Sequence, residues 1–301
     1  MSLLVTGSIA IDTVETPQGS AQEALGGSAI YFALSASLFT PVRIVGAVGE
    51  DFDMSTLKPL TDKRIDTRGV EVRKGSKTFR WHGRYVGAMN EAETVGVELN
   101  VLAEQGPPIP AEFADSRFVF LANTHPALQR EFAQKLPSAE LRVCDTMNLW
   151  IENEPDELRK TLRMVHGLVL NEGEARLLTQ ESNLVTAGRA ILGLGPRFVI
   201  IKKGEHGSLL ISHDDLFIMP PYPTEQVKDP TGCGDSFAGG TLGFIASKGR
   251  LDRETLRSAM ARGSVVASFV IESFSVEALS RVSPSDVEER LATLREMVRF
   301  D

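Results

Sequence analysis

Residues 229–240 read Asp-Pro-Thr-Gly-Cys-Gly-Asp-Ser-Phe-Ala-Gly-Gly. Pro230 fixes its own φ angle and donates no N–H, while Gly232 and Gly234 permit positive φ and leave room for a ligand beside the backbone. We therefore expect a sharp turn and then a helix that begins near Gly234. The unpaired N–H groups of its first turn, with the positive end of the helix dipole, would make an anion site.

The carboxylate of Asp235 is unusual inside an anion site. A pure phosphate cradle gains nothing from it, whereas a site that must also take a proton from an attacking hydroxyl needs a base. Taken alone, the segment also has an ordinary interpretation. Glycine-rich turns open many helices, and the dipole favours an Asp in the first turn.

The composition is that of a soluble globular protein. The chain has 301 residues, of which 42% are hydrophobic and 24% charged, so it is long enough to bury a core. Its net charge of −8 argues against a nucleic-acid partner, because no surplus of Lys and Arg is available to neutralise phosphates. An anionic small substrate is not excluded, since a local site can be positive on an acidic protein.

Two observations predict a cytoplasmic location. Cys144 and Cys233 do not make a disulfide framework and lack zinc-ligand spacing, so we expect reduced thiols. Residues 1–11 are apolar but lack a basic leader and a cleavage site, which predicts a first strand and not a signal peptide. No apolar run approaches the roughly 18 residues of a membrane span, so we expect no membrane partner.

Strands and helices alternate along most of the chain. Continuous apolar runs predict buried strands at 3–5, 42–48, 117–121, 141–144, 168–170 and 198–201, and a hairpin at 207–211. Apolar residues at helical spacing predict helices at 26–39, 156–166, 171–178 and 283–298. The last of these has Ser283 as its cap, Pro284 in first position and an apolar stripe that ends at Val298. The pattern predicts an α/β fold with a mostly parallel sheet covered on both faces.

Residues 68–103 break this pattern. Segments 78–85 and 94–99 alternate apolar and polar residues, which predicts half-exposed antiparallel strands. We expect the insert, with part of 13–25, to form a small sheet that stands off the main body as a lid over the strand ends. Gly and Pro at 106–110 predict a linker after it.

Asn171 and Glu174 follow the apolar run at 168–170 and open a predicted helix. Their oxygens could orient a hydrated Mg²⁺ ion, which keeps most of its waters and needs few protein ligands. The same spacing is also that of a capping box, in which both side chains serve the helix end.

Residues 202–207, Lys-Lys-Gly-Glu-His-Gly, lie between a predicted strand and a hairpin. The glycines would let a nucleotide approach the backbone, and a lysine could meet its phosphates. An ordinary turn with exposed lysines fits equally well.

Asp12 and the pair Gly26-Gly27 lie after the first strand and at the start of the first long helix. A carboxylate beside backbone amides suits the recognition of vicinal hydroxyls, although a turn and a loop explain the same residues. Two nucleotide signatures are missing. The chain has no G-x-x-x-x-G-K-[ST] motif, and the G-x-G at 193–195 precedes a predicted strand, so it is no Rossmann fingerprint.

Together these motifs resemble the ribokinase-like (PfkB) carbohydrate kinase family over nearly the whole chain. Residues 229–240 are similar to the family's second signature, D-T-x-G-A-G-D-x-F, with Pro230 and Cys233 as departures. Gly26-Gly27 and residues 46–51 resemble the first signature, and the Asn171 segment resembles the N-x-x-E magnesium motif. Residues 202–207 lie where the family has its adenine-nucleotide loop. Four matches in the same order are far harder to obtain by chance than one.

The resemblance implies one ribokinase-like domain over 1–301, a doubly wound sheet with a small β lid, that phosphorylates a hydroxymethyl group with ATP and Mg²⁺. It implies Asp235 as the general base and the amides of Gly232, Cys233 and Gly234 as the anion hole. It places ATP near Asn171, Lys202, Gly204 and Gly207, water-mediated Mg²⁺ at Asn171 and Glu174, and the acceptor at Asp12, Gly26, Gly27, Ser28, Tyr31, Asn123 and Asp235. In some members a monovalent cation, K⁺ for instance, binds at positions that match Asp229 and Thr231.

Two further departures from the family lie at positions where the resemblance places the acceptor. Ribokinase has a lysine and an asparagine where this chain has Ser28 and Tyr31, which argues against ribose. We expect a sugar kinase, and the alternative within the same class is a nucleoside kinase. A less favoured alternative, from a different class, is a non-catalytic ligand-binding or regulatory protein. Aromatic residues of the insert (Phe79, Trp81, Tyr85) could stack on a substrate or pack the lid, and its basic residues (Arg80, His82, Arg84) could bind an anion or face solvent. A homodimer through the lid is also expected from the resemblance.

Overall fold

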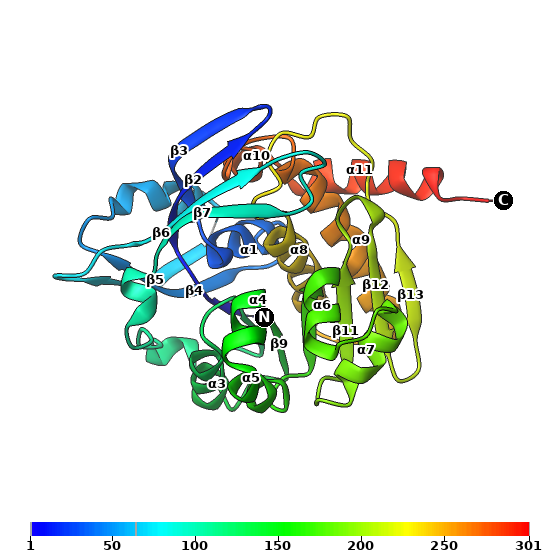
Figure 1. The fold of residues 1–301 in the computed structure, drawn as a ribbon, viewed down its shortest axis with the longest axis horizontal. Helices are drawn as coiled ribbons and strands as arrows, with labels where there is room; N and C mark the ends of the chain where they lie inside the picture. The colour runs from blue at the N-terminus through cyan, green and yellow to red at the C-terminus, as the bar shows by residue number, and fades with distance from the viewer. Residues whose placement is uncertain (1, 64, 301) are drawn as a thin grey trace.

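The computed structural model describes residues 2–63 and 65–300. Its main element is a nine-stranded sheet in the order β13-β12-β11-β10-β9-β8-β1-β4-β5, which is parallel from β5 to β11 and antiparallel at β12 and β13 (Figure 1). This confirms the predicted α/β class. The strands are β1 (Leu3–Thr6), β4 (Val42–Gly49), β5 (Ile65–Arg73), β8 (Phe118–Leu121), β9 (Leu141–Asp145), β10 (Gly167–Asn171), β11 (Phe198–Lys202), β12 (Ser208–Ser212) and β13 (Leu216–Met219).

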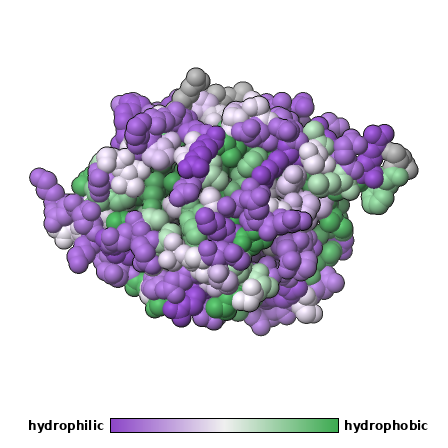
Figure 2. Space-filling view, turned by 90° about the horizontal axis from the view of Figure 1, so that it is seen from above, coloured by the Kyte–Doolittle hydropathy of each residue, from purple (hydrophilic) through white to green (hydrophobic). Residues whose placement is uncertain are grey.

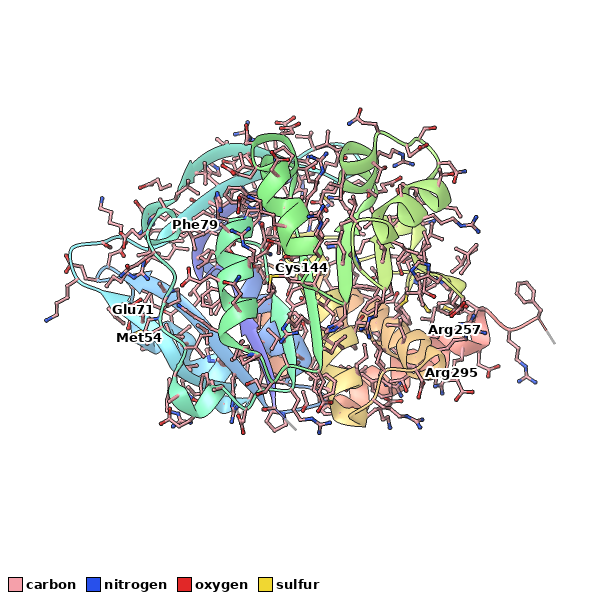
Figure 3. The ribbon with its side chains drawn as sticks, turned by 90° about the horizontal axis from the view of Figure 1, so that it is seen from below. Met54, Glu71, Phe79, Cys144, Arg257 and Arg295 are labelled. Atoms are coloured by element: carbon pink, nitrogen blue, oxygen red, sulfur yellow. The ribbon has the colours of Figure 1, made fainter. Side chains whose placement is uncertain are left out.

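Helices cover both faces of the large sheet. Alternate residues of one strand point to opposite faces, so Leu3 and Val5 join one hydrophobic cluster and Leu4 joins the other. The first cluster packs against α1 (Ser28–Ala36), α2 (Lys58–Asp62), α8 (Cys233–Lys248), α9 (Arg253–Val270), α10 (Glu277–Arg281) and α11 (Pro284–Met297). The second packs against α3 (Pro126–Lys135), α4 (Asn148–Asn153), α5 (Pro155–Leu162), α6 (Glu172–Thr179) and α7 (Leu184–Leu192). Cys144, on β9, lies among these elements in the interior of the molecule (Figure 3).

A separate four-stranded sheet has the order β3-β2-β6-β7 and contains both parallel and antiparallel pairs. Figure 1 shows its strands together at the upper left, and Figure 2, which views that side, shows apolar residues at the centre of the face with hydrophilic residues around them. The strands are β2 (Ala10–Thr16), β3 (Gly19–Gly26), β6 (Phe79–Tyr85) and β7 (Ala92–Glu98).

The boundaries of this small sheet correct the predicted insert of 68–103. Residues 68–73 belong to β5, which pairs with β4 at the edge of the large sheet. An edge strand has one neighbour and can keep polar side chains in solvent, which explains why its sequence does not look like an inner strand. Asp12, expected just past the end of the first strand, lies inside a second strand, β2, which excludes the alternative of a turn.

Helices α1 and α8 pack unusually closely because α8 presents glycines to α1. A methyl group added at Gly239 would lie 2.4 Å from the carbonyl oxygen of Phe32, and one added at Gly243 would lie 2.7 Å from the Cα of Ala36. At the other end of this contact, Tyr31 in the first turn of α1 lies against Gly232 at the start of α8. The packing therefore brings the N-terminal ends of both helices to one place.

The C-terminal helix begins as predicted. The hydroxyl of Ser283 accepts a hydrogen bond from the N–H of Asp286, whose carboxylate in turn accepts from the N–H of Ser283, and Pro284 takes the first position. The expected apolar stripe is one residue too long, because Val298 follows the helix and is 40% exposed. Among the described residues, no helix is both long and apolar enough to cross a membrane.

We expect Gly239→Val to lower the free energy of unfolding by about 3 kcal/mol, since its side chain would overlap the backbone of α1. Urea denaturation measures the change. Ser247→Val, at an exposed position of the same helix, is the matched control and should change stability by no more than about 0.5 kcal/mol. Equal stability of the two variants would contradict the close packing of α1 and α8.

Candidate active site

A cavity of about 1180 Å³ lies between the small sheet and the carboxyl ends of the parallel strands. Open α/β sheets bind ligands at this end. The cavity gathers most of the residues predicted from the sequence: Asp12, Gly27, Ser28, Tyr31, Asn123, Glu174, Lys202, Thr231, Gly232, Gly234 and Asp235. The other predicted residues are not part of its lining: Gly26, Asn171, Gly204, Gly207, Asp229 and Cys233.

The segment before α8 has the turn that the sequence predicts. Gly232 is the N-cap residue, with φ of 75°, and the helix begins at Cys233. A methyl group added at Gly232 would lie 2.4 Å from two atoms of the Tyr31 ring, so this position needs glycine for its backbone angle and for its space. Tyr31, which was predicted as a substrate contact, therefore also packs against the turn at Gly232.

Asp235 lies in the first turn of α8 and lines the cavity. Burial raises the pKa of its carboxyl group, while the positive charge of Lys202 and a backbone N–H oppose that effect. Lys202 reaches the same place, because a methyl group added at Gly234 would lie 2.5 Å from its Nζ atom. Among the described residues of the lining, Lys202 is the single lysine or arginine.

Asp12 is 6% exposed, and its side chain fills the space beside Gly26. Burial raises the pKa of Asp12 to about 7, with a further contribution from the negative charges of Asp229 and Asp235, although the N–H of Gly27 opposes the shift. A methyl group at Gly26 would lie 1.9 Å from the carboxylate of Asp12. Glycine is thus required at position 26 to leave space for the Asp12 side chain, although Gly26 itself does not line the cavity.

Gly27 and Ser28 hold the start of α1 against the end of β1. Gly27 has φ of 99°, and a methyl group there would lie 2.4 Å from the carbonyl oxygen of Ser8. The hydroxyl groups of Ser8 and Ser28 are 3.0 Å apart, and the hydroxyl of Ser8 also accepts from the N–H of Ser28. Both the hydroxyl and the N–H of Ser28 are therefore engaged by the hydroxyl of Ser8. Ser8 also lines the cavity and was not predicted from the sequence.

Asn171 and Glu174 form the capping box that the sequence allows. The Asn171 side chain accepts from the N–H of Glu174, and one carboxylate oxygen of Glu174 accepts from the N–H of Asn171, both at 2.7 Å. Glu174 still lines the cavity at 8% exposure, where burial raises its pKa and Lys202 lowers it. Capping thus occupies one oxygen of Glu174 and leaves the other for a ligand.

Asp145, at the end of β9, was not predicted. It is 7% exposed, lines the cavity, and its Oδ1 atom has no hydrogen-bond partner among the described residues. Burial raises its pKa well above the usual range, and the negative charge of Asp235 adds to this while Lys202 opposes it. The available signal was an acidic residue directly after a buried strand of the parallel sheet.

No three His, Cys, Asp or Glu side chains of the described residues form a ready-made metal site. The pair Asp145 and Glu174 nevertheless offers carboxylate oxygens on one wall of the cavity, one of them unpartnered. These are the ligands that a partly hydrated Mg²⁺ ion takes. A second unpartnered oxygen belongs to Asp229, which is 1% exposed and uses its other oxygen to accept from the N–H of Thr231 at 2.9 Å.

Asn123 lines the cavity, where a substrate contact was expected, but its side chain interacts with other residues of the cavity wall. Its oxygen accepts from the indole N–H of Trp150 at 2.9 Å, and its amide nitrogen lies 3.1 Å from the sulfur of Met147. Trp150 also meets the ring of His125 edge-on, at 5.1 Å between centroids. Asn123 thus orients an aromatic wall that the sequence did not predict.

The loop at 202–207 is a tight turn at the end of β11. Gly204 and Gly207 have φ of 52° and 79°. A methyl group at Gly207 would lie 2.1 Å from the carbonyl oxygen of Met219, which accounts for glycine there. Neither glycine lines the cavity, so a nucleotide would meet them outside it.

The structure distinguishes the aromatic from the basic residues of the small sheet, whose roles the sequence left open. Phe79, Trp81 and Tyr85 line the cavity. The basic residues do not line it and are paired, as Arg80 with Glu23 and Asp51, and His82 and Arg84 with Glu15. They are therefore not free to bind an anionic substrate in this arrangement.

The model of the pfkB family of carbohydrate kinases matches residues 2–281. The chain belongs to this family. This pfkB-family kinase is 31% identical to cytidine kinase of Thermococcus kodakarensis over 274 residues, which are 88% of this chain and 96% of that protein. It is 24% identical to inositol 3-kinase of Arabidopsis thaliana over 283 residues, 90% of this chain and 74% of that one.

The fold of this kinase is ribokinase-like, as predicted. The nucleoside kinase of Burkholderia thailandensis in complex with inosine aligns with a TM-score of 0.78 over 97% of this chain and 98% of that chain, at 19% identity. Ribokinase of Cryptococcus neoformans in complex with ADP aligns with a TM-score of 0.79 over 96% and 99%, at 21% identity.

We expect Gly232→Ala to lower the activity of this kinase by at least about 100-fold, because the added methyl group cannot coexist with Tyr31 at φ of 75° and must displace the turn. Activity and thermal denaturation are measured together. Gly75→Ala is the matched control, since Gly75 has the same φ of 75° with nothing within 4 Å of an added methyl group, and it should stay active. A fully active Gly232→Ala would show that the turn is not needed.

Proposed function

We propose that this kinase transfers the γ-phosphate of ATP to a hydroxymethyl group of a nucleoside. The shape of the cavity carries this proposal, since a polar end at Asp12 and Asp235 continues between two apolar walls. The small sheet contributes Phe79, Trp81 and Val97 to one wall, together with Leu99 directly after β7, and the body contributes Met147, Leu149 and Trp150 to the other. Flat aromatic surfaces suit a base, whereas a lone sugar would leave them uncovered.

The relatives support the same choice. The similarity to a cytidine kinase covers nearly the full length of both chains. The sequence alone favoured a sugar over a nucleoside, and this proposal reverses that order because of the aromatic walls. The ribose of a nucleoside would place hydroxyls at Asp12 and the amides near Gly27, as predicted for a sugar.

The charges of the cavity favour an uncharged acceptor. Its polar end holds Asp12, Asp145, Glu174 and Asp235, with Lys202 as the one lysine or arginine in the described lining. A phosphate or carboxylate on the acceptor would meet like charges in a partly dehydrated site. We therefore infer that Lys202 serves the phosphates of ATP and not the acceptor.

In the proposed reaction, Asp235 accepts the proton of the attacking hydroxyl as the new O–P bond forms and the bond to ADP breaks. Burial raises the pKa of Asp235, which makes it a stronger base than an exposed carboxylate. The amides of Gly232, Cys233 and Gly234 would stabilise the transferring phosphoryl group at the start of α8. The Cys233 side chain takes no part, since its sulfur lies 3.7 Å from the carbonyl oxygen of Ala267.

We infer that Asp145 joins Glu174 in holding hydrated Mg²⁺, with Asn171 orienting Glu174, while Gly204 and Gly207 lie beside ATP. The ion would neutralise charge on the phosphates. The unpartnered oxygen of Asp229 fits a monovalent cation such as K⁺, with Thr231 next to it.

Two inferences concern the small sheet as a whole. Its hydrophobic cluster consists of Val14, Tyr85 and Met89 with Trp81 and Val227 at its margin, which is too small to fold alone, so we infer one domain over residues 1–301. A homodimer through this sheet stays a prediction. In its favour, β7 is an edge strand that exposes Val95, a residue outside the cavity lining.

The decisive experiment is an acceptor panel with ATP and Mg²⁺. It contains cytidine, uridine, adenosine, inosine, ribose, fructose and myo-inositol, with ADP formation and product mass as readouts. We expect turnover of nucleosides, and Asp235→Asn should lower kcat by at least about 100-fold while nucleotide binding persists. Turnover of sugars alone would replace this proposal with a sugar kinase. Equal activity of wild type and Asp235→Asn would refute the assigned base.

The acceptor KM should depend on pH through Asp12. The pKa of Asp12 is raised to about 7, and hydroxyl donors bind its ionised form, so KM should rise as the pH falls below 7 and approach a tenfold rise per pH unit. Asp12→Asn should have a higher KM without this dependence. Asp214→Asn, at an exposed position, is the control and should keep the wild-type profile. A flat KM profile in the wild type would contradict the role of Asp12.

A further inference from the structure

The end of β6 and the turn after it connect the small sheet with two loops of the body. Tyr85 is the last residue of β6, and the turn runs on to β7 at Ala92. Most contacts between this sheet and the cavity are apolar side chains, but here the small sheet makes polar contacts with the loop before α8 and with the loop after β11.

Tyr85 makes the first of these contacts. The hydroxyl of Thr231 donates to the hydroxyl oxygen of Tyr85 at 3.4 Å, in a buried position. The ring of Tyr85 is 8% exposed and packs in a cluster with Val14 and Met89, against which Val227 also lies. The cluster that contains Tyr85 therefore meets the loop before α8 on both sides of Asp229, at Val227 and at Thr231.

Asn90 makes the second contact. Its amide nitrogen lies 3.3 Å from a carboxylate oxygen of Glu205, and a methyl group added at Gly204 would lie 3.0 Å from its side-chain oxygen. The same short turn thus reaches the loop where we place ATP. Movement of the small sheet cannot leave either loop unaffected while these contacts hold.

We propose that Tyr85 is a positioning residue that couples the small sheet to the anion hole. Thr231 directly precedes Gly232, and its N–H is fixed to Asp229. Its hydroxyl contacts both Asp229 and Tyr85, so the small sheet can act on the position of the turn through this group. An acceptor under the small sheet draws Tyr85 onto Thr231 and brings the amides of residues 232–234 into place. This inference rests on the proposed kinase reaction but not on which acceptor is used.

The kinetic test uses Tyr85→Phe, which keeps the ring and removes the hydroxyl. We expect kcat to fall about three- to tenfold, the range for one hydrogen bond, while the acceptor KM changes less than twofold. Tyr222→Phe is the matched control. Tyr222 packs beneath Arg290 outside the cavity lining, so its kcat should not change. An unchanged kcat in Tyr85→Phe would overturn the proposal.

A double-mutant cycle separates coupling from packing. Thr231→Val removes the partner hydroxyl, so Tyr85→Phe should have little further effect on kcat in that background. Additive losses in the double variant would show that Tyr85 acts elsewhere and would overturn the proposal.

Hydrogen exchange tests the coupling without any ligand. In Tyr85→Phe, amides of β6 and β7 and those of residues 231–236 should exchange at least about twofold faster than in the wild type, while those of β12 stay unchanged. A residue that only packs the small sheet would leave 231–236 unaffected, and that result overturns the proposal. If no acceptor of the panel is turned over, the proposed function fails, and this exchange measurement alone decides on the coupling.

Discussion

The close approach of α1 and α8 is the contact on which the site depends. Glycines on α8 let its backbone meet that of α1, and Tyr31 lies on Gly232 where both helices begin. Two helix N-termini then point to the same end of the cavity, one beside Asp12 and the other beside Asp235. A side chain in place of a glycine at the contact between α1 and α8 would move the N-terminus of one helix relative to that of the other. The packing of these two helices therefore also sets the geometry available for phosphoryl transfer.

The second organising feature is an excess of buried or half-buried carboxyl groups over cations in the cavity. The pKa values of Asp12, Asp145, Glu174 and Asp235 are all raised, in each case mainly by burial, and Lys202 opposes the shift for the last three. Unpaired buried charge is costly, and it is retained where a ligand will compensate for it. The site is therefore electrostatically incomplete by itself, as expected for a reaction that brings both a cation and hydroxyl donors.

The sequence predicted the structure correctly where a local rule assigns a residue type to one structural role. The turn at Gly232, the capping box of Asn171 and the start of α11 at Ser283 follow from local rules and were found. It failed where tertiary context decides: the edge strand β5 looked like part of the insert, and Asp12 lies inside a strand. Asp145 and the wall formed by Asn123 and Trp150 depend on which strand ends become neighbours, which no local pattern states.

The placement of the aromatic walls has a practical consequence. The chain has two tryptophans, and both line the cavity, Trp81 from the small sheet and Trp150 from the body. Tryptophan fluorescence of the unlabelled protein therefore comes from the two sides of the cavity alone. Replacing either indole with phenylalanine would leave an emitter fixed to one side, so that each half of the site could be observed separately as ligands arrive.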